Sequence, residues 1–355
     1  MAIEWLAGNR LRGTTAERPS ASLQSPSVGG WVELGRTTLS GNSDTIDVTS
    51  LADKRYYMVL THTLDSGQTN VKYKFNSDSG SNYAKRQSIN GGSDSTGSSQ
   101  TNIEIVQDYA DDDRFQVGYI TNLASKEKLM INHAVERGDN SGASNAPARV
   151  ETVAKWANTS DALSAVNVFN DRTGDFTSGS EVVVLGWDPS DSHTTNFWQE
   201  LASAELSSAG DTINSGTITA KKYIWFQVYA KGANTELQFR LNSDSGSNYA
   251  SRRSGDGGSD STFTSQTSSK INATGGASHT ACFMNGFIIN NSANEKLVIT
   301  HQVATEATGA GTAPRRSEGV TKWSNTSSQI TSIQAINNST GDFGTGSFIK
   351  VWGSN

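Results

Sequence analysis

Two loops of this sequence place several side-chain oxygens at short spacing. Each contains two Asn, one Asp and one Tyr at the same positions: Asn76, Asp78, Asn82 and Tyr83, then Asn242, Asp244, Asn248 and Tyr249. Oxygens in such loops can bind Ca²⁺, but each loop has one carboxylate and no bidentate Glu follows. We therefore expect a β-turn network of side-chain to amide hydrogen bonds, in which Gly80 takes a positive φ. Metal binding and subunit contact are the weaker alternatives.

A second repeated set combines an Arg–Glu pair with a tryptophan. Its members are Arg149, Glu151 and Trp156, and then Arg316, Glu318 and Trp323. Residues two apart on a β-strand lie on the same face, so each Arg and Glu can form a salt bridge. A ligand-binding arginine is the alternative. The tryptophans are expected to anchor a core or an interface.

His133 and His301 occupy equivalent positions, each at the end of an expected strand. Paired histidines can bind a metal, but these two are expected in different domains, and neither has a second His or Cys nearby at ligand spacing. We interpret both as structural imidazoles and expect no metal site and no cofactor.

The sequence shows no arrangement of a catalytic nucleophile. It has no nucleophile elbow in a strand-to-helix setting and no phosphate-binding glycine loop. The single cysteine, Cys282, lies in an apolar run and has no histidine in its own motif. Paired carboxylates for glycoside hydrolysis need only spatial proximity, so they leave no sequence motif. We expect no enzymatic activity and no catalytic residues.

A long internal repeat organises these motifs. Residues 76–84 recur letter for letter as 242–250, and residues 91–96 recur as 257–262. This period is the size of a domain, not that of a short solenoid repeat. We expect an N-terminal arm at 1–28, a first repeat at 29–187, a linker at 188–195 and a second repeat at 196–355.

The elements that carry the motifs are expected to be β-strands. Residues 71–75 and 237–241 alternate between apolar and polar side chains, as strands with one buried face do. Charged residues make up only 18% of the chain, and glycine is abundant. No stretch shows a convincing helical pattern. These features predict an all-β protein with two tandem β-sandwich domains of jelly-roll type.

The N-terminal segment begins with apolar residues and then carries arginines. We expect an extended arm that docks on a neighbouring subunit through Trp5, Leu6, Arg10 and Arg12; a disordered terminus is the alternative. The net charge of −6, without a basic run, argues against nucleic acid as a partner. No apolar segment is long enough for membrane insertion, and no secretory signal is expected.

Several motifs together resemble virion proteins encoded by marine tailed viruses. They lie at residues 5–13, 75–84, 118–122, 155–160 and 346–353. One departure is Leu241, which stands where the first repeat has Phe75. The resemblance implies a structural protein of the particle surface, as a capsid decoration, a fibre or a tail component. Its partners would be further copies of itself and other virion proteins, and its location the virion.

Two alternatives remain open from the sequence. One is a carbohydrate-binding or host-adhesion module of a virion or cell surface, which would bind glycans and should show an exposed aromatic cleft in both repeats. The other is a double-jelly-roll major capsid protein, which ranks lower because the two rolls of such proteins normally diverge more than these repeats do.

Overall fold

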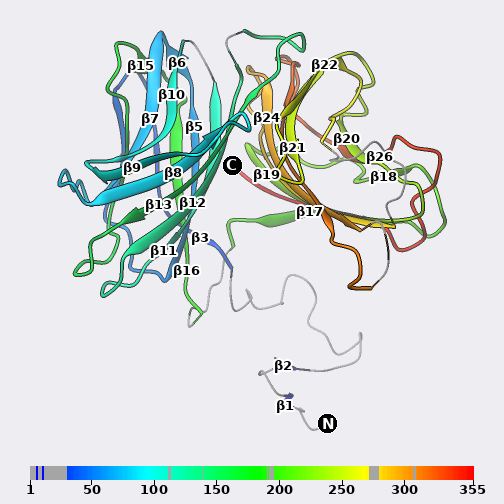
Figure 1. Ribbon diagram of the computed structural model, residues 1–355, viewed down its shortest axis with the longest axis horizontal. Helices are drawn as coiled ribbons and strands as arrows, with labels where there is room; N and C mark the ends of the chain where they lie inside the picture. Colours follow the sequence, from blue (N-terminus) through cyan, green and yellow to red (C-terminus); the bar gives the residue numbers. More distant parts are fainter. Residues whose placement is uncertain are drawn as a thin grey trace.

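The computed structural model shows an all-β protein, as predicted (Figure 1). It describes residues 5–6, 10–11, 30–110, 113–138, 140–189, 191, 196–271, 280–305, 307 and 309–355, with backbone alone for 5–6, 10–11 and 106–110. No helix occurs in these ranges, and therefore none that is long and apolar enough to cross a membrane.

The first repeat forms a large antiparallel sheet and a small one. The large sheet has the strand order β3 (Val32–Thr38), β16 (Glu181–Trp187), β5 (Tyr56–Thr63), β11 (Arg114–Thr121), β12 (Lys128–Glu136), β13 (Ala148–Trp156), β8 (Tyr83–Ile89) and β9 (Ser95–Gln100). The small sheet has the order β10 (Ile103–Ala110), β7 (Gln68–Phe75), β14 (Val166–Phe169) and β4 (Thr45–Val48). Two short strands, β15 (Asp175–Phe176) and β6 (Asp65–Ser66), pair beside them.

The second repeat reproduces this strand order. Its large sheet runs β17 (Gln199–Glu205), β27 (Phe348–Ser354), β19 (Tyr223–Lys231), β23 (Ala281–Ile289), β24 (Lys296–Thr305), β25 (Arg315–Trp323), β21 (Tyr249–Gly255) and β22 (Ser261–Gln266). Its small sheet runs β18 (Thr212–Asn214), β26 (Ile333–Asn337) and β20 (Leu237–Leu241).

The alternating segments of the sequence do form strands. The segment 71–75 lies in β7, and 237–241 coincides with β20. In β7 the alternate residues Val71, Tyr73 and Phe75 are fully buried, because they face the large sheet of the same repeat.

Each repeat has its own core between its large and its small sheet. In the first repeat, residues of the small sheet such as Tyr73 and Val168 pack with Val59 and Trp156 of the large sheet. The second repeat has an equivalent core around Phe239 and Trp323. A third core lies between the two large sheets, which face each other in the middle of the molecule (Figure 1).

The predicted N-terminal arm lies almost entirely outside the described residues. Only β1 (Trp5–Leu6) and β2 (Arg10–Leu11) are described, and they pair with each other as antiparallel strands. Arg12 lies outside the described residues.

Candidate functional site

The repeated Asn/Asp loop is a closed hydrogen-bond network. The carboxylate of Asp78 accepts hydrogen bonds from the Gly80 amide at 2.8 Å, from Asn82 Nδ2 at 2.8 Å and from Trp156 Nε1 at 2.7 Å. Burial opposes ionisation of this carboxyl, but these bonds outweigh it and hold the pKa of Asp78 below its usual value. The hydroxyl of Tyr83 donates to the carbonyls of Phe75 and Asp78. Both carboxylate oxygens of Asp78 are therefore already occupied by hydrogen bonds within this network.

The second repeat builds the same network. Asp244 accepts from the Gly246 amide, Asn248 and Trp323, and the hydroxyl of Tyr249 donates to backbone carbonyls of the turn. In both loops the leading asparagine, Asn76 or Asn242, accepts two backbone amides of a neighbouring segment through its Oδ1.

The expectation that Gly80 takes a positive φ is wrong. The left-handed residues of this turn are Asn76, with φ of 53°, and Ser77, with φ of 56°. Gly80 is needed for space instead, because a Cβ there would lie 2.7 Å from Asn82 Nδ2 and 3.1 Å from Asp78 Oδ1.

The Arg149–Glu151 pair forms, and it extends across the two repeats. Arg149 Nη1 lies 2.5 Å from Glu151, and Nη2 lies 2.6 Å from Asp260 of the second repeat. Burial disfavours the charged guanidinium, but the carboxylates of Asp260 and Glu151 outweigh it and raise the pKa of Arg149. The equivalent Arg316 is exposed and lies 3.4 Å from Glu318. Arg149 therefore binds the second repeat, through Asp260 and also through Glu318 at 3.9 Å, whereas Arg316 pairs within its own repeat.

The two equivalent histidines touch. His301 Nε2 lies 3.1 Å from His133 Nδ1, and the ring centroids are 4.3 Å apart. They belong to different repeats, but the expectation that neither has a second histidine nearby is wrong, because both lie on the outer faces of their large sheets, and these faces pack together. Glu151 lies within the same group of side chains.

The interface between the repeats joins one half of each large sheet. Phe115 and Val135 of the first sheet form one core with Leu297 and Ile299 of the second. At the edge of this core, Glu181 accepts a hydrogen bond from the Tyr223 hydroxyl at 2.7 Å. The covered half of the first sheet contains the start of β11 and the end of β12, and the covered half of the second contains the start of β24.

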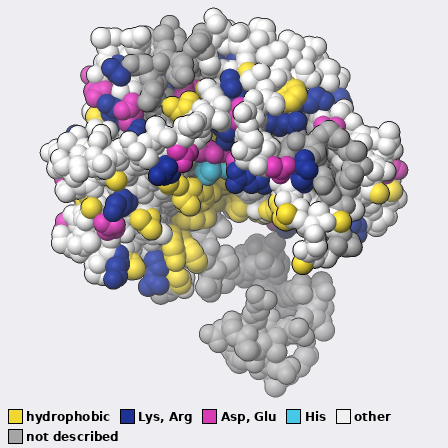
Figure 2. Space-filling model, in the orientation of Figure 1, with side chains coloured by type: hydrophobic (Ala, Val, Ile, Leu, Met, Phe, Trp, Pro, Cys, Tyr) yellow, Lys and Arg dark blue, Asp and Glu magenta, His cyan; other side chains and the backbone are white. Residues whose placement is uncertain are grey.

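The other half of the first sheet's outer face is open and forms an apolar groove of about 690 Å³. Leu129, Ile131 and Val153 line it and are 54%, 51% and 49% exposed. Figure 2 shows hydrophobic side chains gathered on one side of the molecule, below a band of charged side chains that includes a histidine. These aliphatic side chains form the floor of what we name the first-sheet groove.

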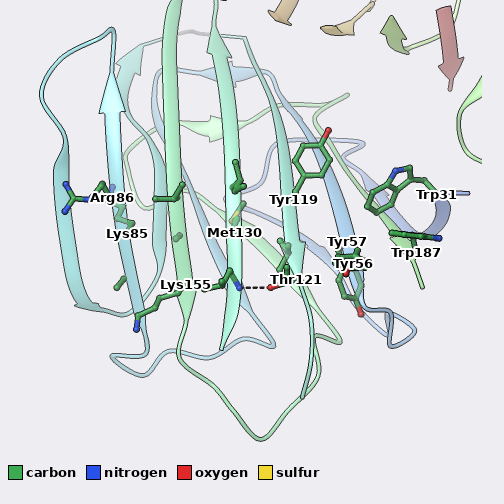
Figure 3. Close-up of a pocket in the computed structure, with 16 residues that line it drawn as sticks. Trp31, Tyr56, Tyr57, Lys85, Arg86, Tyr119, Thr121, Met130, Lys155 and Trp187 are labelled. Carbon is green, nitrogen blue, oxygen red and sulfur yellow. Dashed lines mark hydrogen bonds between the residues drawn. The ribbon is translucent and has the colours of Figure 1, made fainter. Parts of the chain in front are cut away.

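Aromatic and basic side chains stand at opposite ends of the groove (Figure 3). Trp187 stacks on Tyr56 with ring centroids 5.2 Å apart, and Trp31 lies 6.5 Å from Tyr119. At the other end lies Arg86, whose charge is paired with Asp94 at 3.2 Å. Lys155 on the same rim pairs with Glu127 at 3.1 Å, and Lys85 donates to the Glu104 carbonyl. The groove therefore presents an apolar floor with two of its three basic rim groups paired to carboxylates, which favours contact with another apolar surface.

The same positions of the second repeat are buried. Those equivalent to Leu129, Ile131 and Val153 are Leu297, Ile299 and Val320, and they are 0%, 3% and 1% exposed. The large sheet of the first repeat covers them. The chain thus contains one copy of this face that is covered by a β-sheet and one copy that is open.

The second repeat does not cover the first-sheet groove, because three apolar residues of the first sheet are replaced by polar residues at the equivalent positions of the second sheet. Across the interface half of the first sheet, Val183, Leu60 and Val117 lie side by side on neighbouring strands. The equivalent row of the second sheet is Lys350, Gln227 and Asn285. These polar side chains would lose their hydration against the apolar groove, so the second repeat leaves the groove uncovered.

Comparisons with known proteins do not place the chain in a family. No family model matches it, and no curated protein matches it. Among solved structures, the attachment invasion locus protein Ail of Yersinia pestis aligns over 73% of this chain and 98% of its own, at 7% identity and a TM-score of 0.14. Neisserial surface protein A aligns over 80% of this chain and 99% of its own, at 7% identity and a TM-score of 0.10. At these TM-scores the likeness supports neither a fold nor a function.

Proposed function

We propose that this chain is a non-enzymatic structural protein of a viral particle, built from two tandem β-sandwich domains of jelly-roll type. In this proposal it assembles with further copies of itself through the first-sheet groove. The observation that carries the proposal is the contrast between the repeats: the face that is open in the first repeat is the one that a β-sheet of the same chain covers in the second.

A second copy of the chain is the occupant that fits best. The second repeat's own free half-face carries Lys350, Gln227 and Asn285, so it is poorly matched to the apolar groove. The groove itself is apolar, and two of its three basic rim groups are paired with carboxylates, so two grooves related by a two-fold axis can cover each other. Such isologous contacts are the commonest interfaces of homodimers. The virion setting comes from the sequence resemblance.

The oligomeric mass of the purified full chain tests this proposal. We expect light scattering after gel filtration to give a dimer or higher oligomer at micromolar concentration, and Ile131→Asp to shift it to the monomer. The matched control is Leu123→Asp, because Leu123 is equally exposed, at 48%, but does not line the groove. A wild-type chain that stays monomeric at every concentration would contradict the proposal.

The glycan-binding alternative makes a different prediction. Trp31, Tyr56 and Trp187 line the groove, as aromatic platforms do in sugar sites. An aromatic cleft was expected in both repeats, yet the equivalent Trp198 and Tyr223 are buried in the interface, at 4% and 0% exposure. We expect no binding on a glycan array, and binding that Trp187→Ala abolishes would favour the adhesion function instead.

A further inference from the structure

We propose that the His133, Glu151 and His301 side chains form a site for a divalent transition metal of the zinc type, which ties the two repeats together. The first two residues belong to the first repeat and the third to the second repeat. This site is independent of the groove and of the assembly proposed above.

The ligand atoms already lie close together. One ring nitrogen of each histidine and one carboxylate oxygen of Glu151 all lie within 4.8 Å of one another. The two imidazole nitrogens, Nδ1 of His133 and Nε2 of His301, are 3.1 Å apart. Two nitrogens on a tetrahedral Zn²⁺, at about 2.0–2.1 Å from the metal, stand about 3.3 Å from each other. The histidines are therefore almost in place, and only the Glu151 carboxylate has to move inward.

The chemistry of the donors matches the zinc class of metals. Two imidazoles and one carboxylate form a set found in zinc sites, whereas Ca²⁺ and Mg²⁺ prefer oxygen alone. A cavity of about 10 Å³, the size of a single ion or water, is lined by the same three residues together with Arg149.

The two imidazoles meet directly across the interface between the repeats. Their rings cross at an interplanar angle of 75°, and the nitrogens that face each other are Nδ1 of His133 and Nε2 of His301.

The charged groups around the three ligands are compatible with a bound cation. Arg149 is the nearest positive group, but it is engaged by Asp260 through two hydrogen bonds, at 3.2 and 2.6 Å, and by Glu151. In a metal site it would orient the Glu151 carboxylate through the oxygen that does not bind the ion. Glu318 is the cross-strand partner of His301, as Glu151 is of His133, so two carboxylates lie beside the imidazoles. A bound cation would be attracted to both.

Zinc titration of the full chain, without an affinity tag and after treatment with a chelator, tests the site. We expect isothermal titration calorimetry to show one equivalent of Zn²⁺ bound per chain and the thermal unfolding midpoint to rise with it. His301→Gln and Glu151→Gln should each weaken binding at least about tenfold, since even loss of an outer partner of a ligand costs 10–100-fold. Co²⁺ in place of Zn²⁺ should give the visible absorption of a tetrahedral site, and His301→Gln should remove it.

Matched controls separate this site from surface binding. Glu127→Gln removes an exposed carboxylate that pairs with Lys155 away from this group, and it should leave binding unchanged. Circular dichroism checks that each variant folds, and His301→Gln decides the matter if Glu151→Gln unfolds, because it leaves the ion pairs of Arg149 intact. Absence of Zn²⁺ binding overturns the proposal. So does binding that persists in His301→Gln, which would be an adventitious surface site.

Discussion

The pair Ile299 and Ile131 allows a direct test of the contrast between a covered and an open face. The two residues are equivalent in the repeats, but Ile299 is 3% exposed and Ile131 is 51% exposed. Replacing isoleucine by alanine removes three carbon groups, each worth about 0.8 kcal/mol when fully buried. With the cavity left behind, Ile299→Ala should lower the free energy of unfolding by about 3–4 kcal/mol. Ile131→Ala in the monomer should cost about 1 kcal/mol or less, because half of its surface already contacts water.

Urea unfolding followed by tryptophan fluorescence measures both values. Dilute protein is needed, so that the groove is free. At higher concentration the wild type should gain stability by assembly, and Ile131→Ala should lose that gain. Equal losses for the two variants in dilute protein would refute the reasoning, because they would mean that the two faces are equally covered or equally open.

Three further predictions concern buried groups of the fold. Burial, and after it the charge of a nearby lysine, lowers the pKa of His62 to about 3 in the folded protein, so the unfolded chain binds more protons below pH 6.5. The free energy of unfolding should therefore fall by about 2 kcal/mol between pH 6.5 and 5. Urea titrations at the two pH values measure this fall, and His62→Gln should abolish the part of it that His62 causes. Arg149→Ala leaves two carboxylates without their partner and should lower the free energy of unfolding by about 3–5 kcal/mol. Arg316→Ala should lower it by less than about 1 kcal/mol, because the Arg316 side chain is 60% exposed. Similar losses for the two variants in chemical unfolding would contradict the role of Arg149 at the interface between the repeats. Gly286→Ala would drive a Cβ into the Phe226 ring and should cost about 1–3 kcal/mol. Gly118→Ala should cost less, because its Cβ meets the flexible end of Met130 at 2.9 Å and the Asn132 amide at 3.2 Å; thermal melts that rank the two in the opposite order would show that the sheets repack.

The sequence predicts the strands and the turns well, because both depend on local patterns. Alternation identifies β7 and β20, and the repeated loop is a hydrogen-bonded turn. The turn's details are less accessible: asparagine takes the left-handed conformation, and the glycine is needed for space.

The candidate sites could not be predicted in the same way, since they depend on how the repeats pack. Alternation in β12 and β24 is the same, and only the tertiary arrangement leaves Leu129 open and buries Leu297. The contact between His133 and His301 has the same origin. A sequence signal did exist: Val183, Leu60 and Val117 of the first repeat become polar in the second, which marks their face as an interface in one copy only.

The contact between two equivalent histidines has a consequence for the origin of the chain. Equivalent residues meet at the axis of a symmetric dimer, where each subunit presents the same surface to the other. A single-repeat ancestor that paired through this face would have placed its one histidine against its own copy. Fusion of two such genes removes the need for both halves to keep the same interface residues, so Val183 and Lys350 could diverge. In such a history, the surface freed by the divergence would become available for a new contact without the loss of the old one.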